Sequence, residues 1–140
     1  MNRELHQDAQ RIVDYAIRQV LPDAAVQKVL RNKRYSGNVY LAAVGKAAWQ
    51  MAKAALECLP EPPVKGIVLT KYGHVKHPLP GMVCYEAGHP VPDDNSFKGT
   101  RAILELTADL TAEDTVLFLL SGGGSALFEQ PLVTAAELQN

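Results

Sequence analysis

A glycine-rich loop follows the most apolar run of the chain. The run 115–120 is aliphatic, β-branched and aromatic without alternation, which is typical of a strand covered on both faces in a parallel sheet. The loop after it consists of Ser121, Gly122, Gly123, Gly124 and Ser125. Because glycines leave the backbone unshielded, successive N–H groups can converge on an anion, aided by the N-terminus of a following helix. The sequence therefore predicts a phosphate-binding loop, with a plain tight turn as the alternative.

Lys46 is the second candidate for this chemistry. It follows another apolar run, 38–44, through Gly45, so it stands at a turn between a strand and a helix. The carboxyl ends of parallel strands share one edge of a sheet. We therefore expect Lys46 to bring a positive charge to the ligand whose oxygens the glycine loop binds. The alternative is a solvated surface lysine, and only the position of Lys46 in the sequence favours a functional role.

Three common motifs fail at these loops. The Walker pattern GxxxxGK[ST] fails because Tyr40 stands at its first glycine and Ala47 at its final Ser or Thr. The dinucleotide fingerprint and the nucleophile elbow around Ser125 both lack their last glycine, since Leu127 occupies that position. No histidine follows Ser125 in these 140 residues, so a hydrolase would need its histidine from elsewhere.

Three histidines, His74, His77 and His89, stand in loops rich in proline and glycine. They are either turn residues with local hydrogen bonds or, for His74 and His89, contacts to the substrate, since functional residues concentrate on loops. Their spacing matches no recognised zinc site. Asp93 and Asp94 could help to hold a metal ion, but helix capping explains at least one of them more simply. We therefore assign no residue to a metal.

The pattern of apolar residues places these groups at the ends of strands. Apolar runs predict strands at 38–44, 66–70, 82–86 and 115–120. Apolar residues spaced by three and four predict helices at 5–21, 23–30, 47–59, 97–108 and 134–140. We expect Asp23 to cap the second helix, and Asp94, Asn95 or Ser96 to cap the fourth. The alternation predicts an α/β fold with a doubly wound, mainly parallel sheet flanked by helices.

Composition limits the classes of partner. The 140 residues, 47% of them hydrophobic, suffice for one globular domain. The formal net charge of −1, with both signs interspersed, argues against nucleic acid and acidic membranes as partners. No apolar stretch approaches the roughly 20 residues of a membrane helix, and the charged N-terminus is unlike a secretory signal. We expect a cytoplasmic protein whose Cys58 and Cys84 are reduced and fill the core.

The glycine loop stands close to the last residue of the sequence. It begins only about twenty residues before Asn140. In a doubly wound fold, ligands bind beyond the carboxyl ends of the strands, and later chain often supplies the opposing wall. We therefore expect residues 1–140 to form a single α/β domain that is the N-terminal part of a longer protein.

Four motifs, in order, resemble one family. They are GKAA at 45–48, GIVLTKYGH at 66–74, EAGHPVPD at 86–93 and SGGGSAL at 121–127. This combination is similar to the N-terminal domain of the type II glycerate kinases, the glycerate 2-kinases. The family is also labelled hydroxypyruvate reductase, from its place in tartrate and glyoxylate metabolism. Four motifs in order are much more specific than any one of them.

The resemblance implies a two-domain kinase that uses ATP and Mg²⁺ to convert D-glycerate to 2-phosphoglycerate, with a Rossmann-like first domain. By match to the motifs, Lys46 would contact phosphoryl oxygens and Ser121–Ser125 would cradle phosphate. D-glycerate and a nucleotide are then the expected partners, and the chain could also form a homodimer. Two alternatives remain: a non-catalytic ligand-binding or dimerisation fragment, and an NAD(P)H-dependent hydroxypyruvate reductase, which would lack the dinucleotide fingerprint.

Overall fold

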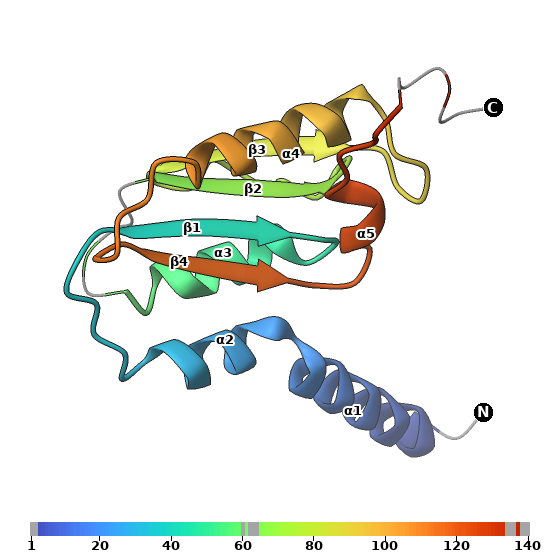
Figure 1. The fold of residues 1–140 in the computed structure, drawn as a ribbon. Coiled ribbons are helices and arrows are strands. Elements are labelled where there is room, and N and C mark those ends of the chain that lie inside the picture. Colours follow the sequence, from blue (N-terminus) through green and yellow to red (C-terminus); the bar gives the residue numbers. More distant parts are fainter. Residues whose placement is uncertain (1–2, 60, 62–64, 134–136, 138–140) are drawn as a thin grey trace.

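The chain folds around a four-stranded parallel sheet (Figure 1). The computed structural model describes residues 3–59, 61, 65–133 and 137. The strands are β1 (Val39–Val44), β2 (Lys65–Lys71), β3 (Met82–Ala87) and β4 (Thr115–Leu120). Their order is β3-β2-β1-β4, and each neighbouring pair is parallel. These are the four predicted strands, and the predicted α/β fold with a parallel sheet is confirmed.

The register of the sheet brings the candidate loops together. Val44 at the end of β1 pairs with Leu69 of β2 and with Leu120 of β4. The chain therefore leaves β1 and β4 at the same level, so that Lys46 and the glycine loop start side by side.

Helices cover both faces of the sheet. On one face lie α2 (Pro22–Leu30) and α3 (Ala48–Leu56), and on the other lie α4 (Asp94–Leu106) and the single turn α5 (Gly124–Leu127). The predicted helix 134–140 lies outside the described residues, except for Glu137.

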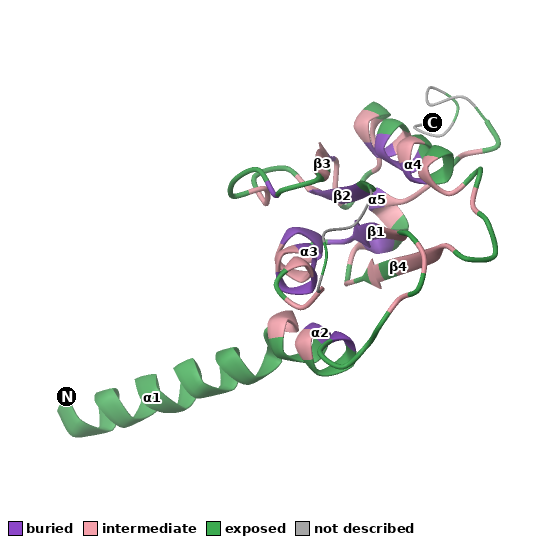
Figure 2. Ribbon diagram, turned by 90° about the vertical axis from the view of Figure 1, so that its left-hand side faces the viewer, coloured by how far each residue is buried: buried purple, intermediate pink, exposed green. Residues whose placement is uncertain are grey.

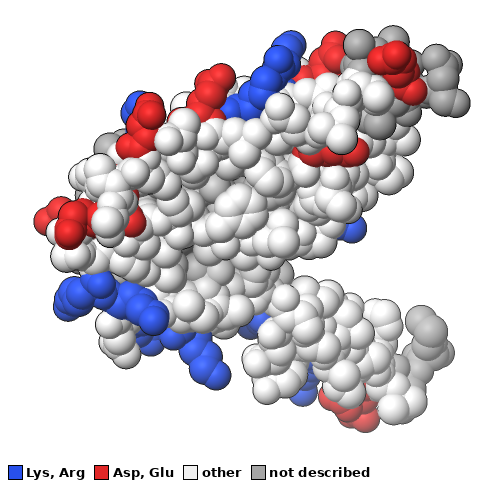
Figure 3. All heavy atoms as spheres, in the orientation of Figure 1, with Lys and Arg blue, Asp and Glu red and all other residues white. Residues whose placement is uncertain are grey.

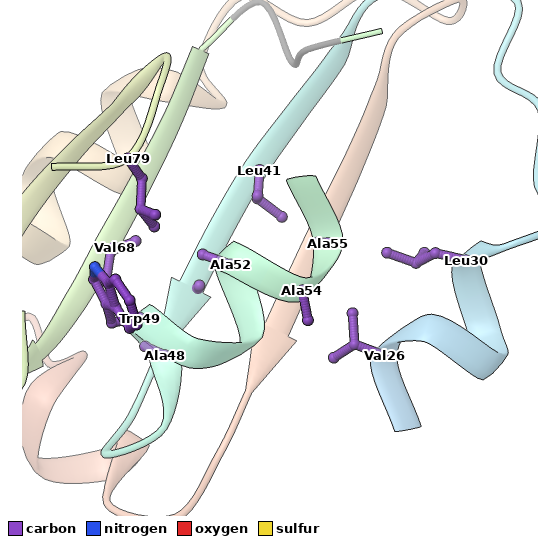
Figure 4. Close-up of a cluster of buried hydrophobic side chains, with 11 residues drawn as sticks. Val26, Leu30, Leu41, Ala48, Trp49, Ala52, Ala54, Ala55, Val68 and Leu79 are labelled. Atoms are coloured by element: carbon purple, nitrogen blue, oxygen red, sulfur yellow. The ribbon is translucent and has the colours of Figure 1, made fainter. Parts of the chain in front are cut away.

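The larger core lies between α3 and the sheet (Figure 4). Alanines on α3 let this helix approach the sheet closely, and Ala54 faces Val26 and Leu30 of α2. The segment between β2 and β3 adds Leu79 to this core, where its exposed fraction is 6%. A packed loop thus makes the parallel connection that a helix commonly makes.

The prediction that β4 is covered on both faces is wrong. β4 lies at the edge of the sheet and none of its residues is fully buried. Phe118 is 45% and Leu120 is 61% exposed. Together with Val29 of α2 they line an apolar hollow of about 230 Å³. The apolar run correctly predicts a strand, but whether its faces are covered depends on elements far away in the sequence.

The helix caps also differ from the predicted ones. Pro22 occupies the first turn of α2, where its missing N–H costs nothing, and no side chain caps this helix. Asp23 instead accepts a hydrogen bond from Gln50 and joins α2 to α3. α4 begins earlier than predicted because Asp93 caps it, with Ser96 completing a reciprocal capping box.

The first helix, α1 (Arg3–Val20), extends away from the sheet (Figure 2). None of its residues is buried, and apolar side chains such as Leu5, Ile12 and Val20 are more than half exposed. His6 is exposed, and Cys58 and Cys84, which we expected to fill the core, are only partly buried. None of the described helices is both long and apolar enough to span a bilayer.

Charged side chains do not cover the molecule uniformly. On the face shown in Figure 3, acidic groups lie mainly along the α4 side, while basic groups gather near the connection from α2 to β1. That connection carries Arg31, Lys33 and Arg34. With a net charge of −1, the whole chain has no strong field of one sign, so an anion must be held by local groups.

Candidate functional site

The turn after β1 is built directly against the end of β4. Gly45 adopts a left-handed conformation with φ +114°. A Cβ atom at this position would lie 2.3 Å from Ser121 Oγ and 2.5 Å from the Ser121 carbonyl oxygen. Only glycine permits both this φ and this approach. Gly45 therefore sets the close spacing of the two loops that carry the predicted site.

Ser121 joins these loops through its side chain. Its hydroxyl accepts a hydrogen bond from the Ala47 N–H at 3.0 Å and lies 3.3 Å from the Val44 carbonyl oxygen, to which it donates. Ser121 is half-buried. The hydroxyl predicted to cradle phosphate is thus engaged within the protein, and the ligand-facing groups must come from the residues around it.

Lys46 lies at the centre of the cluster. Its N–H donates to the Gly122 carbonyl oxygen at 2.9 Å. Its side chain runs along the glycine loop, since Cβ atoms at Gly123 and Gly122 would lie 3.2 Å from its Cγ and 3.8 Å from its Cε. Lys46 is exposed, and no carboxylate of the described chain lies within ion-pair distance of its ammonium group. Its charge is thus available to an anion.

The three glycines have different surroundings. Gly123 adopts a left-handed φ of +87°, and a Cβ atom there would lie 2.7 Å from His89 Nε2. A Cβ atom at Gly124 would lie 2.5 Å from Leu120 Cδ1, whereas Gly122 has open space beside Lys46. In the part of the chain that the structure describes, the N–H groups of Gly122 and Gly123 donate to no protein acceptor. They remain available to a ligand.

The helix after the glycine loop is short. α5 spans only Gly124–Leu127, a single turn. Its dipole is correspondingly small, so the predicted help from a helix N-terminus is weaker at this loop than expected. Ser125 is exposed in this turn. Lys46 brings a full positive charge to the glycine loop that this single turn does not supply.

The loop histidines have different roles in the structure. His89 lies against Gly123, and His74 Nδ1 lies 2.8 Å from the Lys46 carbonyl oxygen. His77 instead packs edge-on against Trp49, with ring centroids 4.7 Å apart, and its carbonyl accepts the Trp49 Nε1–H at 2.9 Å. The structure thus brings His74 and His89 to the cluster and leaves His77 as part of the loop's packing.

Glu86 is a site-supporting residue that the motifs contain but that we did not predict. Its Oε1 accepts the N–H groups of His74 and Val75, both at 2.8 Å. A carboxylate at the end of the mostly apolar strand β3 was the available signal. It could not be interpreted from the sequence because the contact joins the end of a strand to a separate loop.

Asp93 secures the second proline-rich loop. Burial opposes its charged form, but hydrogen bonds from Tyr72, Gly88 and Ser96 outweigh that effect, and the pKa of Asp93 lies below its ordinary value. The hydrogen bond to Asp93 raises the pKa of Tyr72. The sequence left two roles open for Asp93, a metal ligand and a helix cap. The structure shows the helix cap. Among the described residues no group of three or more His, Cys, Asp or Glu could hold a metal ion.

A separate cavity lies away from this cluster. It measures about 290 Å³ and is lined by Phe97 and Arg101 of α4 and by residues that follow α5. It includes none of the predicted site residues, which lie instead at the open edge of the sheet.

The sequence of this domain matches a known family over residues 8–140, described as a domain of unknown function, DUF4147. The chain belongs to the DUF4147 family. It is 55% identical over 130 residues to the D-glycerate 2-kinase of Thermotoga maritima, which covers 91% of this chain and 31% of that protein. It is 38% identical over 121 residues to a provisionally named hydroxypyruvate reductase of Agrobacterium vitis, over 86% of this chain and 27% of that protein.

A solved structure has the same fold. The crystal structure of a glycerate kinase from Thermotoga maritima superposes with a TM-score of 0.87 at 52% identity, over 99% of this chain and 34% of that one. The DUF4147 chain thus spans about a third of the length of these relatives. The resemblance to the type II glycerate kinases, including the second family label, is confirmed.

Proposed function

We propose that this chain forms the phosphate-binding side of the active site of a glycerate 2-kinase, which transfers a phosphoryl group from ATP to D-glycerate and yields 2-phosphoglycerate. One observation carries the proposal. The Lys46 N–H donates a hydrogen bond to the Gly122 carbonyl oxygen, and the Lys46 side chain runs along a glycine loop whose N–H groups are available. The names of the relatives support the reaction.

This cluster fits the demands of phosphoryl transfer. The reaction needs positioning and positive charge around the phosphoryl oxygens more than covalent participation of the protein. The Lys46 ammonium and the N–H groups of Gly122 and Gly123 are donors only, so they suit an anion and not a cation. When bound, Mg²⁺ would neutralise phosphate charge; the described residues of this cluster do not form a site for it, and we assign it to the nucleotide.

The remainder of the reaction needs further groups. A general base for the glycerate hydroxyl is not assigned to any residue of this chain. We propose that a second domain supplies it, since the chain spans only about a third of its relatives. We also propose that the protein acts in the cytoplasm, where ATP is available, and that it forms a homodimer, which light scattering can test.

The first prediction tests Lys46 in the complete gene product that contains this sequence. Lys46→Met removes the charge but keeps most of the side chain, so kcat should fall by on the order of 100-fold or more, because the charge is needed most in the transition state. The KM for D-glycerate should change much less. A coupled assay of ADP release measures both.

Lys28→Met is the matched control. Lys28 is an exposed lysine on α2, outside the cluster, and its loss should leave kcat within about twofold, as expected for a surface substitution. Equal activities of the two variants would remove Lys46 from the site.

The alternatives have separate outcomes. Calorimetry on the 140-residue chain with Mg-ATP and with D-glycerate detects a binding module that lacks catalysis. The name of the Agrobacterium relative favours testing NADH oxidation with hydroxypyruvate. Oxidation of NADH, without ADP release from ATP and D-glycerate, would replace the kinase with a reductase.

A further inference from the structure

Lys46 is held at both of its backbone groups. Its N–H donates to the Gly122 carbonyl oxygen at 2.9 Å, and its own carbonyl oxygen lies 2.8 Å from His74 Nδ1. The residue carries an exposed, flexible side chain, so the direction of its ammonium group depends on how firmly the backbone is fixed. His74 is one of the two groups that fix it.

Glu86 in turn fixes the backbone of His74. Glu86 stands at the end of β3, and its Oε1 accepts the N–H groups of His74 and Val75, each at 2.8 Å. Two bonds to one carboxylate oxygen hold the start of the loop 72–81 against the end of β3. In the middle of the same loop, Trp49 donates a hydrogen bond to the His77 carbonyl. The loop is therefore held on both sides of Lys76, with His74 facing Lys46.

The contact with a carbonyl oxygen defines the state of the His74 ring. A carbonyl only accepts, so His74 Nδ1 must carry the hydrogen and donate it. In the neutral ring, Nε2 then carries no hydrogen. The group that serves Lys46 is thus Nδ1, while a direct contact to a substrate would use Nε2.

We propose that His74 and Glu86 are positioning residues for Lys46: Glu86 orients His74, and His74 Nδ1–H holds the Lys46 carbonyl, so that the ammonium group faces the phosphate-binding loop. This inference rests on the proposed kinase function and assigns to His74 a task other than substrate contact. It adds Glu86 to the residues on which turnover depends and assigns it an effect through His74, whose N–H it accepts.

Two isosteres of His74 separate the two tasks. The amide nitrogen of Asn lies as many bonds from Cα as histidine Nδ1, and that of Gln extends toward the position of Nε2. In the complete gene product, His74→Asn should keep kcat within about threefold, whereas His74→Gln should lower kcat on the order of 10- to 100-fold, as a displaced catalytic group does. The opposite ranking, with an increased KM for D-glycerate in His74→Asn, would overturn the proposal.

Glu86 has an equally close pair of variants. Glu86→Gln keeps an oxygen that can accept both N–H groups, and Glu86→Met keeps the length without an acceptor. We expect Glu86→Gln to behave like the unmodified protein and Glu86→Met to lower kcat about as much as His74→Gln. The double variant Glu86→Met, His74→Gln should lose little more than either single variant, because both act through one contact. If the loss of kcat in the double variant equals the product of the two single losses, Glu86 and His74 act independently and the proposal is wrong.

An activity-independent measurement distinguishes failure of this inference from failure of the proposed function. Nitrogen-15 NMR of the 140-residue chain reports which ring nitrogen of His74 carries the hydrogen. The expected result is the Nδ1–H form, retained in Glu86→Gln and partly lost in Glu86→Met. An Nε2–H form in the unmodified chain would contradict the positioning role even if the kinase is active. The Nδ1–H form without any kinase activity would instead contradict the proposed function.

Discussion

Gly45 has the least room of the glycines around Lys46. Its φ of +114° is unfavourable for any side chain, and a Cβ atom would meet both the hydroxyl and the carbonyl of Ser121. Gly73 offers a matched comparison, because its φ of +75° is also left-handed but a Cβ atom there has nothing within 4 Å. A side chain at Gly73 would therefore meet backbone strain alone, whereas a side chain at Gly45 would meet both backbone strain and a steric clash.

We predict that Gly45→Ala lowers the free energy of unfolding more than Gly73→Ala. Gly73→Ala should cost about 1 kcal/mol from the left-handed backbone alone, and Gly45→Ala about 2 to 4 kcal/mol once overpacking is added. Denaturation in urea, followed by fluorescence of the single tryptophan, Trp49, gives both values. Equal losses would mean that the loop around Ser121 moves away freely.

At the level of single residues, the sequence predicted which groups lie close together better than it predicted the hydrogen bonds that these groups make. Residue type led us to predict an anion site at Lys46 and the glycines, and their positions after β1 and β4 correctly predicted that they lie at one edge of the sheet. The roles of Ser121 and Glu86 were not predictable in this way. Their hydrogen bonds cross 74 and 12 residues of sequence, and a hydroxyl or carboxylate does not reveal in the sequence whether its partner is a ligand or a backbone N–H.

The start of α4 is the element whose stability should depend on pH. Asp93 accepts the N–H groups of Asn95 and Ser96 at 3.1 and 3.0 Å and a hydrogen bond from Tyr72 at 2.7 Å. Its pKa in the folded protein lies below the ordinary value of 3.8. The charged form therefore stabilises the fold fully at pH values well above the ordinary pKa of 3.8, and this contribution is lost as the pH falls through the lowered pKa.

We predict that Asp93→Ala lowers the free energy of unfolding by about 0.5 to 2 kcal/mol at neutral pH, the usual cost of losing an N-cap. Asp93→Asn keeps an acceptor at the cap and should cost less. The difference between the unmodified protein and Asp93→Asn should be constant from pH 7 to 5 and shrink below pH 4. Urea denaturation over this range measures it, and a difference that grows in acid would contradict the assignment.

Element boundaries were predictable where local signals agreed. Each predicted strand overlaps an observed one because each apolar run is bounded by glycine, proline or polar residues. The cap of α4 was predicted one to three residues late, because several polar residues in succession could serve and only the backbone conformation of Asp93 decides among them. Exposure of β4 was not predictable, since it depends on whether another element packs against Phe118 and Leu120.

At the scale of the whole molecule, the fold and the family follow from patterns that span the chain. Alternating strands and helices gave the parallel α/β class, and four ordered motifs gave the resemblance. The same patterns do not say which apolar faces are covered. Two faces with strong apolar character, on α1 and on β4, remain exposed in the described part of the chain.

The exposure of α1 leads to a prediction about where the stability of the domain resides. Helices in proteins are stabilised mainly by packing of their apolar face, and α1 buries no residue. Deletion of residues 1–20 should therefore change the free energy of unfolding of the 140-residue chain by less than about 0.5 kcal/mol, as surface changes do. Leu30→Ala in α2 is the comparison, because Leu30 is only 5% exposed in the α3 core.

Leu30→Ala should lower the free energy of unfolding by about 2 to 5 kcal/mol through lost burial and the cavity it leaves. The deletion and this substitution thus compare an unpacked helix with a packed one. Urea denaturation at two protein concentrations makes the test specific. If the deletion costs as much as Leu30→Ala, α1 must pack against something in solution. A midpoint that rises with protein concentration would then identify a second copy of the chain as its partner, because association stabilises the folded state by mass action. A midpoint independent of concentration would place the contact within one chain.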